Sequence, residues 1–183
     1  MLYAIFYLFI VLIEIVFAIF SAGYMILLFY SSLKGSPYVP TKDKAMKNIF
    51  EEAGLKKGQV MYDIGCGDGR VVRYAVKQYG VRGIGIDINP MLIFFARLKA
   101  RMMKLKGAEF RVQNIFDVDL SDADVIYIFL LPQFLVKIQK KLERGTKKGA
   151  VIISHGFKMD AWSAYNYKTI KAKPFPTYFY KIQ

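Results

Sequence analysis

The sequence predicts an α/β fold in which a doubly wound parallel sheet follows one N-terminal transmembrane helix. Three observations support this prediction. Short apolar runs alternate with stretches of helical spacing between about residues 60 and 154. A glycine-rich turn, residues 65–69, follows the first of these runs. Residues 1–30 are almost wholly apolar, which is typical of a membrane span.

Residues 1–33 are predicted to be a transmembrane anchor. The first thirty residues contain one charged side chain, that of Glu14, and the first basic residue is Lys34. Since about 20 apolar residues cross a bilayer core, the run is long enough. A secretory signal would need a basic start and a shorter apolar core of about 7–15 residues. A re-entrant hairpin around residues 21–23 would leave arms that are short for spanning.

The charges around the span predict its orientation. Lys34, Lys42, Lys44 and Lys47 follow it and no basic residue precedes it, so a single-pass topology with the C-terminal body on the cytoplasmic side is expected. Glu14 lies near the middle of the span, where an ionised, lipid-facing carboxylate is costly. It is therefore expected to be protonated or to contact another helix, in a dimer or in a substrate protein.

The rest of the chain is strongly basic. Residues 34–183 hold all 27 basic residues against 13 acidic ones, a formal net charge of +14. This charge suits contact with anionic membrane lipids, and it would suit nucleic acid equally well. The bilayer anchor favours lipids and disfavours nucleic acid. Cys66 is the only cysteine and His155 the only histidine, so neither a disulfide nor a Cys/His metal site is expected.

The chain after the anchor divides into a connector with an N-terminal helix (residues 34–59) and an α/β domain (residues 60–183). Two prolines stiffen the connector at residues 36–40, and Thr41 is expected to cap the helix that follows. Strands are predicted at about 60–64, 82–87, 109–113, 124–129 and 149–154. Helices are predicted at about 69–80, 90–106 and 132–144. Alternating residues at 168–171 and 177–181 predict a terminal strand pair.

The turn after the first strand is the clearest functional motif. Residues 63–70 read D-x-G-x-G-x-G-R, in which bare backbone and the free N–H groups of the next helix can face a ligand. A dinucleotide fingerprint would need a glycine at the position of Arg70. Asp87 ends the second strand, 18 residues beyond Gly69, where a carboxylate can accept hydrogen bonds from both ribose hydroxyls of an adenosine ligand.

This arrangement resembles the class I S-adenosylmethionine (SAM) methyltransferases. The resemblance implies a Rossmann-like sheet with a C-terminal β-hairpin over residues 60–183, SAM as cofactor and S-adenosylhomocysteine as product. In that family the loop after the third strand contacts adenine, which points to residues 114–116 here. The implied cofactor-binding residues are Asp63, Gly65, Cys66, Gly67, Asp68, Gly69, Asp87, Ile88, Asn114, Ile115, Phe116 and Phe129.

A narrower resemblance is to membrane-anchored protein-lysine methyltransferases that modify the c subunit of ATP synthase and the adenine nucleotide translocator. It covers the apolar N-terminal segment and residues 38–41, 63–70, 87–90 and 129–132. The sequence Phe-Leu-Leu-Pro after the fourth strand has no polar group to hold a planar nitrogen, unlike the Asn-Pro-Pro-Tyr of amide and adenine methyltransferases. Asp87 stands where these relatives often have Glu, and Cys66 where they have Ser.

The resemblance implies a membrane-protein substrate with an accessible lysine. Tyr38 and Thr41 are expected to line a lysine channel, and Pro132 to close it. His155 is either a proton acceptor or a packing residue at a strand end. A methyltransferase acting on a lipid or quinone, and a non-catalytic SAM-binding module on the membrane, are the alternatives.

Overall fold

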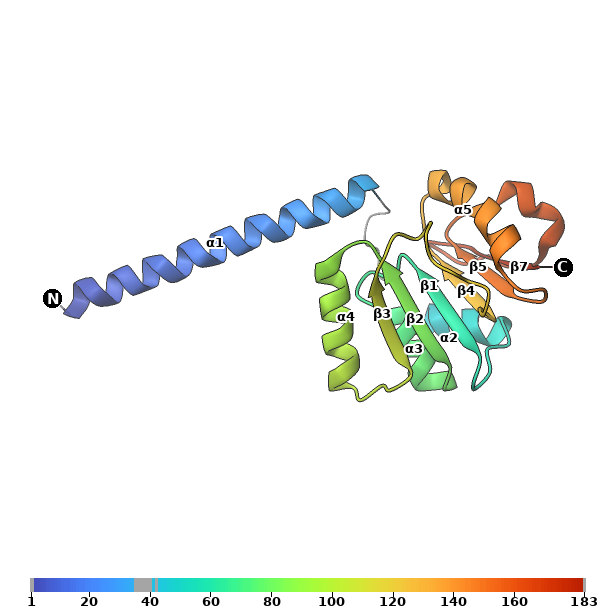
Figure 1. The fold of residues 1–183 in the computed structure, drawn as a ribbon, viewed down its shortest axis with the longest axis horizontal. Coiled ribbons are helices and arrows are strands. Elements are labelled where there is room, and N and C mark those ends of the chain that lie inside the picture. Colours follow the sequence, from blue (N-terminus) through green and yellow to red (C-terminus); the bar gives the residue numbers. More distant parts are fainter. Residues whose placement is uncertain (1, 35–40, 42, 183) are drawn as a thin grey trace.

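The computed structural model of the protein describes residues 2–34, 41 and 43–182 (Figure 1). The helices are α1 (Leu2–Lys34), α2 (Asp43–Glu52), α3 (Arg70–Tyr79), α4 (Pro90–Met102), α5 (Pro132–Gly145) and the 3-10 helix η1 (Asp160–Tyr165). The strands are β1 (Val60–Ile64), β2 (Arg82–Asp87), β3 (Ala108–Val112), β4 (Val125–Ile128), β5 (Val151–His155), β6 (Asn166–Ile170) and β7 (Thr177–Lys181).

The described strands form one sheet in the order β3-β2-β1-β4-β5-β7-β6. The first five strands run parallel, and β7 is antiparallel to both β5 and β6. The predicted parallel sheet and its C-terminal hairpin are therefore confirmed. Since parallel neighbours align their ends, the residues that follow β1, β2, β4 and β5 gather at one edge of the sheet.

Both faces of the sheet are covered, which explains why the central strands are continuous apolar runs. Ile64, Ile86 and Ile128 face a core that includes α5 and Trp162 of η1. The residues that alternate with them face the other side, where α2 and α3 pack. α4 packs beside α3 on that second side, against β2 and β3. α2, which was predicted as part of the connector, thus contributes buried side chains to the core of the sheet.

Two helical elements differ from the sequence prediction. α4 ends at Met102, short of the expected residue 106, because Lys104 adopts a left-handed backbone conformation with φ +53°. η1 was not predicted. It buries Trp162 completely, and the indole N–H of this residue donates to a Glu143 carboxylate oxygen on α5.

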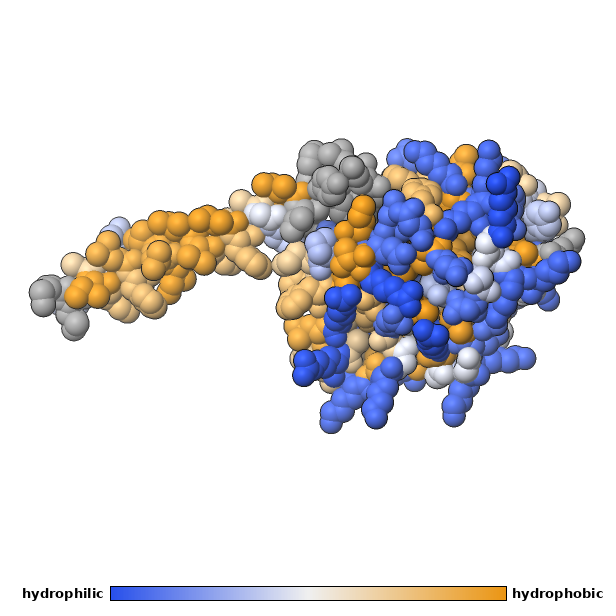
Figure 2. All heavy atoms as spheres, viewed as in Figure 1, coloured by the Kyte–Doolittle hydropathy of each residue, from blue (hydrophilic) through white to orange (hydrophobic). Residues whose placement is uncertain are grey.

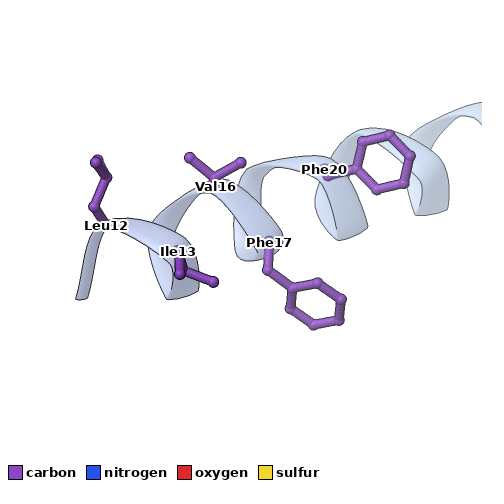
Figure 3. A pocket seen from close by; sticks show the side chains of 5 residues that line it. All are labelled: Leu12, Ile13, Val16, Phe17 and Phe20. Atoms are coloured by element: carbon purple, nitrogen blue, oxygen red, sulfur yellow. The ribbon is translucent and has the colours of Figure 1, made fainter. Parts of the chain in front are cut away.

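By its length and its apolar composition, α1 could cross a membrane. The candidate span is Tyr3–Ile26, and none of it is buried inside the structure. The helix continues without a break through residues 21–23, so the hairpin alternative is wrong. A shallow groove along the helix is lined only by apolar side chains, those of Leu12, Ile13, Val16, Phe17 and Phe20 (Figure 3). Such a surface suits contact with lipid chains.

Candidate active site

The glycine loop between β1 and α3 is fixed by its own backbone. The N–H groups of Gly65 and Cys66 donate to the carbonyl of Ile86 at 2.8 and 2.9 Å, which ties the loop to the end of β2. Gly65, Gly67 and Gly69 all have positive φ, at +82°, +54° and +72°. Residues with a side chain rarely adopt this conformation, so the loop geometry depends on glycine.

Two of these glycines are also required by space. A Cβ atom on Gly69 would overlap Cε1 of Phe110, and one on Gly65 would lie 2.9 Å from Cδ2 of Leu130. Phe110 comes from β3 and Leu130 from the segment after β4, so side chains from both sides of the sheet order press on the loop. A ligand can therefore approach bare backbone that is held rigidly in place.

Asp87 joins the glycine loop to the start of α4. One carboxylate oxygen accepts the N–H of Gly67 at 2.9 Å and the other accepts that of Asn89 at 2.8 Å. Burial raises the pKa of Asp87, although the N–H groups of Asn89, Gly67 and Ile88 oppose the shift. A carboxylate has about four acceptor positions, so the N–H groups do not use up its capacity to accept from a ribose hydroxyl. Ile88, the next residue, is partly exposed beside it.

Asp63 is the most unusual side chain of the site. It is 2 % exposed, and its Oδ2 atom has no hydrogen-bond partner among the described residues. Burial, together with the charges of Asp87 and Asp68, raises the pKa of Asp63 well above its usual range. An unsatisfied buried carboxyl is unfavourable. A ligand that brings a polar partner to this carboxyl stays a prediction.

The carboxylate of Asp68 is occupied by protein groups. The Lys99 ammonium lies 2.8 Å from Oδ2, and the guanidinium groups of Arg73 and Arg70 lie 3.6 and 3.5 Å from its oxygens. Burial alone would raise the pKa of Asp68, but the Lys99 hydrogen bond and the three positive charges lower it. Asp68 thus links α3 to α4. Its predicted contact with the cofactor stays a prediction.

The remaining predicted cofactor residues differ in how exposed they are. Cys66 is buried, and burial raises the pKa of its thiol well above the usual value, so the thiol is unreactive. Asn114 is exposed after β3, and its Oδ1 atom accepts the N–H of Phe116 at 3.1 Å. Ile115 and Phe116 are half-buried against the core. Their contact with adenine stays a prediction.

An aromatic cluster lies at the carboxyl ends of β4 and β5. The rings of Phe129 and His155 meet edge to face at 4.7 Å between centroids, and Phe175 meets Phe129 at 5.1 Å. Tyr127 stacks 6.1 Å from His155, and its hydroxyl lies 3.1 Å from that of Thr41. The sequence did not single out Phe175, and it placed Tyr127 only at the start of the substrate-side segment, residues 127–132. The position of Tyr127 follows from strand register, which pairs it with Asp63 of β1.

The predicted catalytic residues fall into different surroundings. Thr41 and His155 lie in the aromatic cluster, whereas Pro132 is exposed at the first turn of α5, and Tyr38 lies outside the described residues. His155 is 5 % exposed, and its Nδ1 atom lies 2.8 Å from the Thr177 hydroxyl. Burial lowers the pKa of His155 to about 4. It is therefore neutral and a weak base, which favours the packing role.

The strand order, the antiparallel β7 and the glycine loop at the carboxyl edge define a Rossmann-like, SAM-dependent methyltransferase. The site fits the cofactor, since it offers a backbone cradle, a ribose acceptor and an unsatisfied buried carboxyl. A sequence model described as the ANTKMT methyltransferase domain matches residues 63–166. The chain belongs to this family.

Curated relatives agree with this assignment. A protein-lysine N-methyltransferase of Saccharolobus islandicus is 35 % identical over 129 residues, which is 69 % of this chain and 80 % of the relative. The human lysine N-methyltransferase of the ATP synthase c subunit is 32 % identical over 69 % of this chain. The mouse adenine nucleotide translocase lysine N-methyltransferase is 30 % identical over the same share. The alignments cover 54 % and 55 % of these two mammalian proteins, about half of their length.

Solved structures show the same fold with the cofactor bound. An RNA methyltransferase from Salinibacter ruber in complex with S-adenosylhomocysteine is 33 % identical, with a TM-score of 0.75 over 79 % of this chain and 94 % of its own. A mutant of MtNAS in complex with SAM has a TM-score of 0.67 over 76 % of this chain and 61 % of its own, at 14 % identity, and so shows the fold alone. SAM is the cofactor of the protein.

Proposed function

We propose that the protein transfers the methyl group of SAM to a lysine side chain of a membrane or membrane-proximal protein. The names of the curated relatives support a lysine acceptor. The observation that carries the proposal within this chain is the aromatic cluster of Phe129, His155 and Phe175 beside the cofactor loop. The apolar ring surfaces suit the aliphatic stem of a lysine side chain.

The chemistry of the cluster suits an amine nucleophile. A free lysine has a pKa of about 10.4, and it must lose its proton before it can attack a methyl group. Loss of hydration beside the cluster disfavours the charged form, and the neutral His155 adds no anion that would stabilise it. SAM, when bound, supplies a methyl group on a positively charged sulfur. The chain's own part is to bind, orient and exclude water.

The membrane location is part of the proposal. α1 is proposed to span the bilayer once, with the catalytic domain on the cytoplasmic side, because Lys34, Lys42, Lys44 and Lys47 follow the span. Membrane lipids are then immediate neighbours of the domain. Glu14 lies within the span and is proposed to contact a helix of a second copy or of the substrate.

Other acceptors would use the same cofactor site. The Salinibacter ruber protein is an RNA methyltransferase, and the basic surface of this chain would suit RNA. A lipid or quinone could enter from the bilayer. A planar base, however, is normally held by hydrogen bonds to its edge. The segment after β4, Phe129-Leu130-Leu131-Pro132, offers no polar side chain for this purpose.

Methyl transfer from labelled SAM to native membranes tests the proposal. The full chain is incubated with membranes and, separately, with total RNA, and the label is counted in protein, lipid and RNA fractions. We expect label in membrane protein, with Asp87→Ala as the inactive control. Label confined to lipid or to RNA would replace the lysine proposal with one of the alternatives. Cofactor binding without transfer to any fraction would leave a non-catalytic module.

A further inference from the structure

α4 is apolar on two opposite faces. Its inner face is buried against α3, β2 and β3 and consists of Leu92, Ile93, Ala96 and Ala100. Its outer face carries Phe94, Leu98 and Met102, which are 57 %, 44 % and 74 % exposed. These three residues are spaced by four along the helix, so they form one continuous strip. An outward strip of large apolar side chains is unusual on a helix already seated in a core.

The other helices of the domain do not share this property. The exposed positions of α2 and α3 are polar or charged, and α5 has a single large apolar side chain exposed, Val136. Figure 2 shows an apolar surface where α4 lies in Figure 1, while hydrophilic side chains cover most of the rest of the visible domain. Figure 1 also shows α4 on the side of the domain from which α1 extends. The apolar strip is therefore confined to α4, on the side of the domain that faces α1 in Figure 1.

Positive charge borders the strip. Residues 88–108 contain five basic residues and no acidic one. Two of the five already have partners within the protein: Lys99 pairs with Asp68, and Arg97 donates to the carbonyl of Phe110 at 3.0 and 2.7 Å. The other three, Arg101, Lys104 and Lys106, are exposed. No ion pair links any of them to a carboxylate among the described residues. Apolar side chains flanked by free cations complement an anionic lipid surface.

The length of chain between α1 and the domain limits where the domain can lie. α1 ends at Lys34, and Thr41 is already buried against Tyr127. Seven residues span at most about 25 Å. Residues 27–34 continue α1 for about 12 Å beyond the candidate span. If α1 crosses the bilayer, the start of the domain must therefore stay within about 40 Å of the membrane surface. A face suited to lipid then has a lipid surface within reach.

We propose that the outer face of α4 docks on the anionic surface of the bilayer that α1 spans. The inference rests on the membrane anchoring proposed above, and it is independent of the methyl acceptor. Phe94, Leu98 and Met102 enter the interfacial layer, while Arg101, Lys104 and Lys106 contact lipid headgroups. Since α4 starts beside Asp87, docking also holds the cofactor site at the membrane edge.

Cysteine labelling of the full chain in lipid vesicles tests this docking. The only native cysteine, Cys66, is buried, so a single introduced cysteine can carry an environment-sensitive fluorophore. The test variant is Leu98→Cys. Val136→Cys is the matched control, because it is an exposed apolar residue on a helix of the opposite face. Val16→Cys, on the apolar surface of α1 in Figure 3, reports membrane insertion separately. SAM binding by each labelled variant confirms that it is folded.

We expect nitroxide-labelled lipids to quench the fluorophore at Leu98→Cys in vesicles containing phosphatidylserine, and to leave Val136→Cys unquenched. Replacing both Arg101 and Lys104 by Gln should weaken docking by about fivefold for each charge removed. Docking should also be weaker on vesicles of phosphatidylcholine alone, which carry no net charge. Quenching at Val16→Cys without quenching at Leu98→Cys would overturn the docking while the anchor stands. No quenching at either site would refute the anchor itself. If the fluorophore at Leu98→Cys instead becomes shielded from water as the protein-to-lipid ratio rises, without quenching by the labelled lipids, a second copy of the chain covers this face. That result would overturn the proposal.

Discussion

The buried imidazole of His155 should make the domain sensitive to acid. In the fold, burial lowers the pKa of His155 from 6.5 to about 4, because the protonated ring would lose its hydration among Phe129, Tyr127 and Phe175. In the unfolded chain the same ring takes up a proton near its ordinary pKa. The stabilising effect of the neutral ring is therefore complete above about pH 6.5 and is lost as the pH falls towards 4.

The size of the effect follows from the shift. A difference of about 2.5 pKa units corresponds to roughly 3 kcal/mol of unfolding free energy when the loss is complete. At about pH 4.5, most of this, about 2.5 kcal/mol, should already be lost. His155→Gln removes the titration while keeping a polar group that can reach the Thr177 hydroxyl. The variant should therefore lack this component of the acid sensitivity.

Urea denaturation of the full chain in detergent micelles measures the effect. Trp162 is the only tryptophan and is fully buried, so its fluorescence reports unfolding of the α/β domain and not of α1. Between about pH 8 and pH 4.5, wild type should lose about 2.5 kcal/mol more than His155→Gln. Parallel losses in the two proteins would show that His155 takes up a proton near its ordinary pKa, which would contradict a neutral imidazole buried among aromatic rings.

Three further predictions concern the cofactor site. Asp87→Ala should reduce SAM affinity at least about a hundredfold in calorimetry, because the ribose acceptor is lost; unchanged affinity would contradict the site. Gly69→Ala should lower the unfolding free energy by at least about 3 kcal/mol, since its Cβ would overlap the ring of Phe110. Gly54→Ala, at φ +65° in open space, should cost only about 1 kcal/mol, and equal losses would argue against the steric account. Ionisation of Asp63 opposes folding, because the pKa of this residue is raised in the folded protein. As the pH rises from about 4 through that raised pKa, the cofactor-free wild type should therefore lose unfolding free energy that Asp63→Asn keeps. A constant difference between the two proteins across this range would refute the raised pKa.

The sheet could be predicted because its elements are encoded locally. Residues 60–64 and 82–87 are short apolar runs with turn signals at both ends, and the structure has strands with the same bounds. η1 could not be foreseen, since one short turn has no periodic pattern, and Trp162 is placed by its contact with Tyr180 of β7. The end of α4 was overestimated because the backbone of Lys104 departs from helix without a glycine or proline to signal it.

The two halves of the candidate site also differ in how far they could be predicted from local sequence. The cofactor half is a contiguous loop plus one strand-end acid, so Gly65, Gly69 and Asp87 could be located from spacing alone. The aromatic half joins residues that are distant along the chain: 86 positions separate Thr41 from Tyr127, whose hydroxyls lie 3.1 Å apart. The packing of α2 on the sheet, where Phe50 contacts Tyr127 of β4, brings them together. The outer strip of α4 was hidden for another reason, because apolar residues on both faces mask the helical period.

Methylation of lysine in a membrane protein is the activity on which the proposed function depends. Mass spectrometry of membranes incubated with the full chain and labelled SAM tests it most directly, with Asp87→Ala as control. We expect labelled methyl groups on lysine side chains of an integral or membrane-bound protein, present with wild type and absent with the variant. The proposed function would be contradicted if the labelled methyl groups that require the wild-type protein were found only on lipid, RNA or other amino acids.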